Sequence, residues 1–267
     1  MISVIILTKN EKERIHACIE SVKWADEIIV IDSNSSDNTT ELAIKNGAKV
    51  YTRTFDNYAN QKNWAMGKAS GEWVLYLDAD ERVLFGLKEE ILSLINSTDC
   101  SAFAISRRNI ILGQEKKYGP FWPDWVIRLV KKDYFQNWVG EVHEHMEFKG
   151  KLGYTNNSFL HLTHRNVEQI ILKNLHWSKI DAKLRLEVCH PEMSGWRFLR
   201  ILFSELFYQG FIRRGFFNGT VGTIDALMQT FSLVTTYVRL WEMQQSKSLD
   251  KVYRDVDSKL IKDDFKF

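Results

Sequence analysis

The chain has 267 residues, of which 45% are apolar and 26% charged, so it can form a large soluble domain with an extension. Its formal charge of +2 excludes a bulk electrostatic attraction to nucleic acid. The unusual feature is an aromatic content of 13%, which suits sugar-binding surfaces, interfaces and protein cores alike.

The cysteines and the apolar runs indicate a cytoplasmic protein. Cys18, Cys100 and Cys189 are odd in number and far apart, which fits a reducing compartment better than a disulfide framework. The apolar run at residues 2–7 is too short for a signal peptide, and the run at residues 219–241 is interrupted by charged residues. We therefore expect no membrane span.

The first hundred residues alternate strand and helix signals. Short apolar runs predict buried strands at residues 3–7, 27–31 and 73–77, and a further strand is predicted at residues 49–52, all of them parallel. Helical periodicity predicts helices between them, at residues 11–23, 39–46 and 58–68. This order predicts an α/β fold with a doubly wound, mostly parallel sheet, in which ligands bind beyond the carboxyl ends of the strands.

The pattern changes twice further along the chain. Residues 100–164 have shorter strand signals and many aromatic residues. Three long helices are predicted after residue 166, at residues 167–186, 196–212 and 219–245. The tail at residues 246–267 is highly charged and predicts a solvated helix or a loose end.

Two carboxylates, Asp78 and Asp80, directly follow the fourth predicted strand. Oxygen ligands of this kind suit Mg²⁺ or Mn²⁺, and such ions usually bridge a protein to the phosphates of a substrate. The other interpretation is a pair of solvated loop acids that cap the next helix. The position at the mouth of a parallel sheet favours the metal site.

Asp32 ends the second predicted strand, where a carboxylate commonly hydrogen-bonds the ribose of a nucleotide. It would also serve as a turn or N-cap residue in the polar loop at residues 33–37. The sequence contains neither Gly-x-Gly-x-x-Gly nor Gly-x-x-x-x-Gly-Lys-Ser/Thr, which disfavours dinucleotide-binding and P-loop proteins. Without such a loop, a metal ion must neutralise more of a diphosphate's charge.

These features resemble the nucleotide-binding half of family 2 glycosyltransferases over about residues 1–85. Three segments carry the resemblance: Val4-Ile-Ile-Leu-Thr8-Lys-Asn10-Glu11, Val30-Ile-Asp32-Ser-x-Ser-x-Asp37-x-Thr39 and Leu77-Asp78-Ala-Asp80-Glu81. Later segments resemble a bacterial subgroup, the β-1,4-glucosyltransferases of the lipopolysaccharide or lipooligosaccharide core: Gly140-Glu-Val142-His143-Glu144, Leu160-His161, Lys173 with Ser178, and Arg214-Gly-Phe-Phe-Asn218-Gly219-x-x-Gly222. Asn218 stands where we expect an aspartate in this subgroup.

The resemblance implies a GT-A fold and a division of the chain into three parts. Residues 1–165 would be the catalytic domain, with a nucleotide-sugar-binding half at 1–99 and an acceptor-side half at 100–165. Residues 166–245 would be a helical extension that faces a membrane or a second copy in a homodimer. Residues 246–267 would be a charged tail.

The resemblance also implies how a UDP-sugar donor and its metal ion would bind. Thr8 and Glu11 would lie beside the uridine, and Asp32 would contact the uracil or the ribose. Lys62 and Asn63 fall where the helix before Asp-x-Asp contacts the donor. The metal region would hold the remaining three residues: Asp78 facing the ribose and the metal, Asp80 as a direct ligand of Mg²⁺ or Mn²⁺, and His161 as a third ligand.

An inverting transfer needs a carboxylate that takes the proton from the acceptor hydroxyl. Glu141 and Glu144 are the candidates, and the family pattern, in which His-Glu is part of the motif, favours Glu144. His143 would orient the base or line the site. A lone histidine is more often a buried structural residue, however, and this applies to His143 and His161 alike.

Two further segments predict contacts with the acceptor and with its surroundings. Trp122, Trp125 and Arg128 resemble the family's acceptor-side segment, where aromatic faces stack on sugars and an arginine meets a phosphate or carboxylate. The other interpretation is core aromatics with a surface arginine.

The predicted helix at 196–214 combines bulky apolar residues with arginines. This combination suits a helix that lies on an anionic lipid surface or, equally, a helix in the core or at a dimer interface.

We therefore expect an inverting, metal-dependent transfer of a hexose, glucose from UDP-glucose, to a heptose of a lipid-linked core oligosaccharide at the inner face of the cytoplasmic membrane. A capsule, exopolysaccharide or protein glycan acceptor is the alternative for the same fold. If the protein is not an enzyme, the alternative is a non-catalytic membrane scaffold protein that binds a sugar nucleotide. The paired aspartates favour the enzyme, because a scaffold has no use for a metal site.

Overall fold

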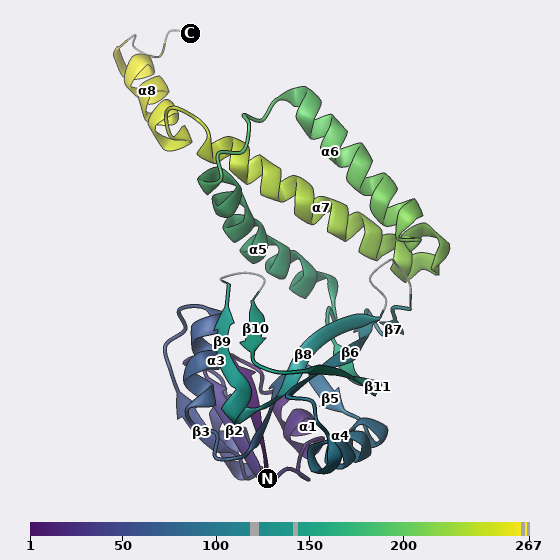
Figure 1. Cartoon of the computed structure of the whole chain (residues 1–267). Helices are drawn as coiled ribbons and strands as arrows, with labels where there is room; N and C mark the ends of the chain where they lie inside the picture. Colours follow the sequence, from purple (N-terminus) through teal and green to yellow (C-terminus); the bar gives the residue numbers. More distant parts are fainter. Residues whose placement is uncertain (118–122, 141–143, 263–264, 266–267) are drawn as a thin grey trace. The chain divides into compact units, whose positions relative to one another are not determined.

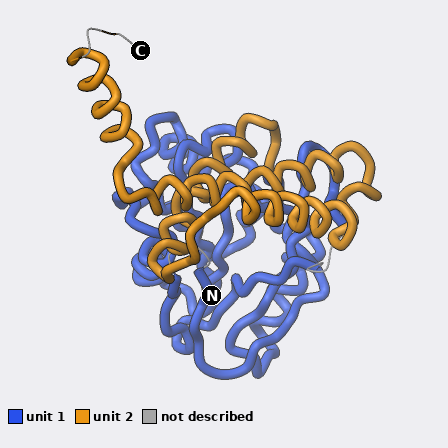
Figure 2. The backbone as a smooth tube through the Cα atoms, turned by 90° about the horizontal axis from the view of Figure 1, so that it is seen from above, with its two compact units in different colours: residues 1–117, 121–163 blue, residues 118–120, 164–267 orange. Residues whose placement is uncertain are grey.

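The computed structural model describes residues 1–117, 123–140, 144–262 and 265. These residues form two compact units, coloured separately in Figure 2. The sheet unit comprises the described residues up to Thr163, and the helical unit begins at His164. Each is described by itself.

The four predicted strands form the parallel half of the main sheet (Figure 1). They pair in the order β3-β2-β1-β4, with bounds β1 (Ile2–Thr8), β2 (Glu27–Asp32), β3 (Lys49–Thr52) and β4 (Trp73–Asp78). The helices that connect them are α1 (Ile15–Glu20), α2 (Thr39–Lys45) and α3 (Tyr58–Met66). The structure thus confirms the predicted alternation of strands and helices.

Helix α1 begins four residues later than the periodicity predicts, at Ile15 instead of Glu11. The backbone N–H groups of Asn10 and Glu11 donate to the hydroxyls of Ser35 and Thr39, in and just after the polar loop that follows β2. These bonds hold the first residues after β1 in a turn. The loops beyond the carboxyl ends of β1 and β2 are therefore tied to each other.

Beyond β4 the sheet becomes mixed. The main sheet continues in the order β4-β8-β6-β11-β5, with β8 antiparallel to both of its neighbours and β7 paired with β6. The bounds are β5 (Glu81–Val83), β6 (Ala102–Ile111), β7 (Gln114–Glu115), β8 (Asp124–Lys131) and β11 (Leu152–Leu162). Helix α4 (Phe85–Ser97) follows β5, and a separate hairpin consists of β9 (Phe135–Val139) and β10 (His145–Phe148).

Both faces of the parallel half are covered, as the unbroken apolar strands require. Successive side chains of a strand point to opposite faces. Val4 and Ile6 of β1 accordingly pack in one apolar cluster with α1 and α4, whereas Ile5 packs in a second cluster with α3 and the β9–β10 hairpin. These two clusters fix the sheet between its helices and leave the carboxyl ends of the strands for the polar loops.

The helical unit is built around one long central helix. Helix α7 (Gly219–Met243) packs against both α5 (Val167–Glu187) and α6 (Gly195–Phe207), as Figure 1 shows. A π-helical turn at Tyr208–Ile212 follows α6, and α8 (Leu249–Lys262) follows α7. None of the helices over the described residues combines the length and the apolar character that a membrane crossing needs.

The Arg214–Gly222 segment makes the tight turn between α6 and α7. A Cβ on Gly222 would lie 2.4 Å from the carbonyl oxygen of Gly215, and a Cβ on Gly215 would lie 2.8 Å from the Cβ of Ala226. Asn218 donates from its side chain to the carbonyl of Arg214. Gly215 and Gly222 therefore permit close packing, and Asn218 stabilises the turn.

Candidate active site

The strand register brings the predicted donor residues to one edge of the sheet. Thr8 pairs with Asp32, and Leu7 pairs with Asp78, so β1, β2 and β4 end at the same level. Ala79 and Asp80 then form a turn between β4 and β5. The mixed half adds His161, which lies in register with Glu81 of β5 and with Asn109 of β6.

Asp78 is held by a buried arginine from the neighbouring strand. Arg128 of β8 donates from Nη2 to Asp78 Oδ2 and lies 3.4 Å from Glu81 Oε1. Glu81 is fully buried and accepts a 2.9 Å hydrogen bond from the backbone N–H of Asp78. Burial alone would raise the pKa of Asp78, but the positive charges of Arg128 and Lys62 outweigh this and hold the pKa below its ordinary value.

Burial has the opposite outcome at Glu81, where it raises the pKa of the carboxyl despite the nearby Arg128. The two neighbouring carboxyls thus have pKa values shifted in opposite directions, and Glu81 stabilises the turn by accepting the backbone N–H of Asp78. The structure places Arg128 beside the paired aspartates rather than on an open surface. Its predicted contact with an acceptor stays a prediction.

Asp80 faces the ring of His161, with His161 Nε2 3.4 Å from Asp80 Oδ2. The other ring nitrogen, Nδ1, lies 2.6 Å from Asn109 Oδ1. Asn109 donates from Nδ2 to Asp124 at 3.1 Å, so its Oδ1 is the acceptor, and His161 Nδ1 carries the proton. In a neutral ring with this tautomer, Nε2 carries the lone pair and faces the Asp80 carboxylate, an arrangement that a positive charge between the two would stabilise.

A second ion pair lies beside the same strands. Lys62 of α3 donates from Nζ to Glu144 Oε1 at 2.7 Å, and its ammonium lies 4.2 Å from the centre of the Trp138 ring. Lys62 is buried, and burial, with help from the charge of Arg128, lowers its pKa. The structure thus brings together Lys62 and Glu144, which are 82 positions apart in the sequence.

Tyr58 lies on the same helix as Lys62, and no motif singled it out. It is half-buried, and burial followed by the negative charges of Asp78, Glu144 and Asp80 raises its pKa. The available signal was its spacing, because Tyr58 and Lys62 are four residues apart on one helix and share a face.

Several predicted donor residues have partners within the protein. Asp32 is buried and accepts hydrogen bonds from the hydroxyls of Thr8 (3.2 Å) and Ser35 (2.5 Å). Glu11 pairs with Arg14 at 2.8 Å. These contacts correspond to the turn-forming interpretation of Asp32, and contact of these residues with a nucleotide stays a prediction.

Asn63 and Trp125 lie at two other places of the sheet unit. The side chain of Asn63 both donates to and accepts from the backbone of Trp138, and so joins α3 to β9. Trp125 is partly exposed and packs edge-on against Tyr154 at 5.2 Å between ring centres. Trp122, Glu141 and His143 lie outside the described residues.

The donor atoms fit a divalent cation with two protein ligands. Among the residues that the structure describes, no group of three His, Cys, Asp or Glu side chains is arranged to hold a metal ion. Asp78 accepts a hydrogen bond from Arg128, whereas Asp80 Oδ2 and His161 Nε2 face each other at 3.4 Å and could bind one cation between them. A carboxylate and an imidazole with a fixed tautomer are a suitable donor set for a divalent cation that takes its other ligands from phosphate or water.

Comparison with protein families identifies the family to which this chain belongs. The model of the family described as "Glycosyl transferase family 2" matches residues 3–148, which are 146 of the 267 residues. The chain belongs to glycosyl transferase family 2. It is therefore an enzyme, and its α/β sheet with a parallel first half is the GT-A-type fold that the sequence predicts.

This glycosyltransferase has relatives that match it over nearly their whole length. An uncharacterized glycosyltransferase of Rickettsia conorii is 29% identical over 265 residues, which cover 94% of this chain and 92% of the relative. The lipopolysaccharide core biosynthesis glycosyltransferase LpsC of Rhizobium meliloti is 27% identical over 94% of this chain and 96% of its own.

Among solved structures, glucosyl-3-phosphoglycerate synthase from Mycobacterium tuberculosis, in complex with Mn²⁺, UDP and glucosyl-3-phosphoglycerate, is 24% identical. It covers 40% of this chain and 44% of its own, with a TM-score of 0.37. At this score the comparison does not bear on the geometry of the site. The fold and the family rest on the sheet topology and on the family match.

Proposed function

We propose that this glycosyltransferase transfers a hexose, glucose from UDP-glucose, with inversion onto a heptose of the inner core of lipopolysaccharide or lipooligosaccharide, with Mn²⁺ or Mg²⁺ as cofactor. One observation carries the proposal: Asp80 faces a His161 ring whose tautomer is fixed by Asn109, at the edge where the parallel strands end. A parallel sheet of this kind binds its ligand at that edge.

Asp80 and His161 would hold the metal ion. When bound, the ion would neutralise the diphosphate of the donor and so stabilise UDP as a leaving group. Because one of the two ligands is a nitrogen, we expect a preference for Mn²⁺ over the harder Mg²⁺. Arg128 keeps Asp78 ionised beside this site, where its carboxylate is available to the hydroxyls of a donor.

Glu144 would act as the general base. In the transfer, the acceptor oxygen bonds to the anomeric carbon as the bond to the diphosphate breaks, and the hydroxyl proton passes to the Glu144 carboxylate. Lys62 holds one oxygen of that carboxylate at 2.7 Å and so fixes its orientation. Tyr58, on which the charges of Glu144, Asp78 and Asp80 all act, lies within the same group and would line the donor site.

Similarity to a relative supports a lipopolysaccharide core saccharide as the acceptor. The relative from Rhizobium meliloti is named for lipopolysaccharide core biosynthesis and matches 94% of this chain at 27% identity. The segments with His143-Glu144 and His161, which resemble the same bacterial subgroup, point to the same acceptor. Transfer to a capsule, exopolysaccharide or protein glycan acceptor is the alternative outcome of the experiment described next.

The test is transfer from radiolabelled UDP-glucose to a deacylated, heptose-containing core oligosaccharide, with Mn²⁺ present. We expect a β-linked glucosyl product, no product with Asp80→Asn, and wild-type activity with Asp99→Asn, which changes a surface aspartate that pairs with Lys151. A panel of UDP-hexoses and acceptors would identify the other substrates. Absence of both transfer and slow donor hydrolysis across that panel would contradict the proposal.

A further inference from the structure

Helix α6 presents an apolar stripe to the outside of the helical unit. The residues recur at helical spacing, and three of them are more exposed than buried: Trp196 (73%), Phe203 (63%) and Phe207 (56%). The stripe continues into the π-helical turn with Phe211. A helix on the surface of a soluble protein normally turns polar residues outward, so this stripe is the reverse of the usual pattern.

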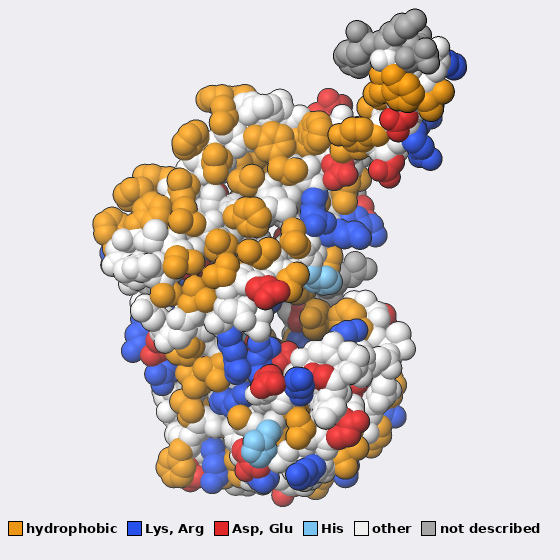
Figure 3. Space-filling model, turned by 180° about the vertical axis from the view of Figure 1, so that it is seen from behind, with side chains coloured by type: hydrophobic (Ala, Val, Ile, Leu, Met, Phe, Trp, Pro, Cys, Tyr) orange, Lys and Arg blue, Asp and Glu red, His pale blue; other side chains and the backbone are white. Residues whose placement is uncertain are grey.

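The stripe is not needed for the core of the helical unit. The opposite face of α6 supplies Ile201 and Phe198, which pack with Ala182 of α5 and Leu240 of α7. The helix is therefore apolar on two sides, and the inward side is the one that packs in this cluster. In Figure 3, exposed apolar side chains are dense over the helical part of the chain.

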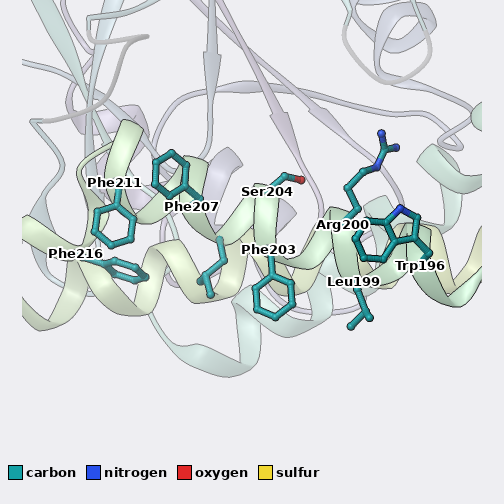
Figure 4. Close-up of a pocket in the computed structure, with 9 residues that line it drawn as sticks. Trp196, Leu199, Arg200, Phe203, Ser204, Phe207, Phe211 and Phe216 are labelled. Carbon is teal, nitrogen blue, oxygen red and sulfur yellow. The ribbon is translucent and has the colours of Figure 1, made fainter.

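The outward side chains enclose a shallow groove of about 700 Å³. Figure 4 shows its lining: Phe211 and Phe216 lie together at one end, and Trp196 and Arg200 lie at the other, with Phe203 between them. Phe207 and Phe211 stack with their centres 5.3 Å apart. The surface is thus a row of aromatic and aliphatic groups with a cation at its edge, which we call the α6 face.

The charges of the segment that forms the α6 face are predominantly positive. Residues 195–217 contain four arginines, at positions 197, 200, 213 and 214, and a single acid, Glu205, so the segment carries a net charge of +3. Glu205 accepts a 2.7 Å hydrogen bond from Gln209. Arg200 and Arg214 are exposed. Long arginine side chains beside an apolar stripe can place their charges at the level of lipid phosphates.

We infer that the α6 face binds the surface of an anionic lipid bilayer, with the apolar stripe at the boundary of headgroups and acyl chains and the arginines at the phosphates. The charge favours this occupant over a second copy of the chain. A two-fold contact would bring the same +3 segment against itself, whereas an anionic surface complements it. The inference goes beyond the proposed function, since it requires neither the donor nor the acceptor.

The experiment is co-sedimentation of the full chain with vesicles of phosphatidylcholine, alone or mixed with phosphatidylglycerol. We expect binding to the mixed vesicles, weakened by high salt because the arginine contribution is screened. The double variant Phe203→Ser/Phe207→Ser should bind about tenfold or more weakly. Arg197→Gln/Arg200→Gln should lose the preference for phosphatidylglycerol.

The matched control is Phe85→Ser, which removes an equally large and 75% exposed ring from α4 in the sheet unit and should leave vesicle binding unchanged. Helical content by circular dichroism and binding of UDP by calorimetry verify that each variant is folded. Because UDP binding is measured without vesicles, failure of this inference is distinguishable from failure of the proposed function.

Three results would overturn the inference. The first is no sedimentation with phosphatidylglycerol vesicles at low salt, and the second is wild-type binding by Phe203→Ser/Phe207→Ser. The third is a dimer in analytical ultracentrifugation that this double variant dissociates, because the α6 face would then belong to a second copy.

Discussion

Lys62 Nζ and Glu144 Oε1 are 2.7 Å apart, and this ion pair joins helix α3 to the segment that precedes β10. The side chain of Lys62 is 4% exposed, and that of Glu144 is 19% exposed. The ammonium of Lys62 is therefore buried against the Trp138 ring, whereas the carboxylate of Glu144 is partly exposed to solvent. A carboxylate that is held on one oxygen and accessible to solvent is suited to receive a proton from a bound hydroxyl.

Glu144→Gln tests the base. The amide oxygen of glutamine still accepts the hydrogen bond of Lys62, so the fold should survive while the ability to take a proton is lost. We expect kcat to fall by about 10²–10⁴-fold, with an unchanged Kd for UDP in calorimetry. Wild-type kcat in Glu144→Gln would instead assign the base to the other predicted candidate, Glu141.

Asp80→Asn and His161→Ala test the metal pair. Each removes one of the two converging ligands, so each should raise the Mn²⁺ concentration needed for half-maximal transfer, and Asp80→Asn should also abolish the effect of Mn²⁺ on UDP binding. Asp99→Asn serves as the control, because Asp99 pairs with Lys151 at the surface. UDP binding that is indifferent to Mn²⁺ in the wild type would argue against a metal site and favour a non-catalytic sugar-nucleotide-binding protein.

Asn109→Leu tests the positioning of His161. Leucine removes the acceptor of the His161 Nδ1 proton, so the ring is free to adopt the other tautomer, in which Nε2 carries the proton and cannot ligate. We expect an apparent Mn²⁺ affinity about 10–100-fold lower, with saturating Mn²⁺ restoring most of kcat. A loss of kcat that excess Mn²⁺ does not restore would indicate a general packing defect.

Glu27→Gln tests the contribution of a buried carboxylate to acid stability. Burial alone would raise the pKa of Glu27, but hydrogen bonds from Lys49, Ser3 and Ser70 outweigh it and lower the pKa from 4.5 to about 2. A lowered pKa in the folded state stabilises the protein above pH 4.5, and this stabilisation is lost as the pH falls from 4.5 toward 2.

Because Lys49 is exposed, we expect Glu27→Gln to cost about 2 kcal/mol of unfolding free energy at pH 7, less than the full shift implies. The difference between wild type and variant in urea unfolding should shrink as the pH is lowered from 5 to 3. Glu72→Gln is the matched control, since Glu72 pairs with Lys131 on the surface and should cost less than about 1 kcal/mol. An equal cost for Glu27→Gln at pH 7 and pH 3 would contradict the linkage.

The local sequence determined the parallel half of the sheet and the family. The predicted strands at 3–7, 27–31, 49–52 and 73–77 correspond to β1 to β4 with differences of at most one residue at their ends. The runs of β1, β2 and β4 are apolar, and such runs between polar loops have few other ways to be buried. The segment Leu77-Asp78-Ala-Asp80-Glu81 predicted that Asp78 lies at the same edge as Asp32, since carboxyl ends of parallel strands share an edge.

Only the tertiary structure decided how the mixed half completes the site. β8 inserts antiparallel between β4 and β6, and this places Arg128 against Asp78, fifty residues away in sequence. The register of β6 and β11 places Asn109 beside His161, which is 52 positions away. No local pattern encodes such pairings, because strand order and register depend on the packing of the whole sheet. The sequence therefore predicts the paired aspartates, and the fold places His161 beside Asp80.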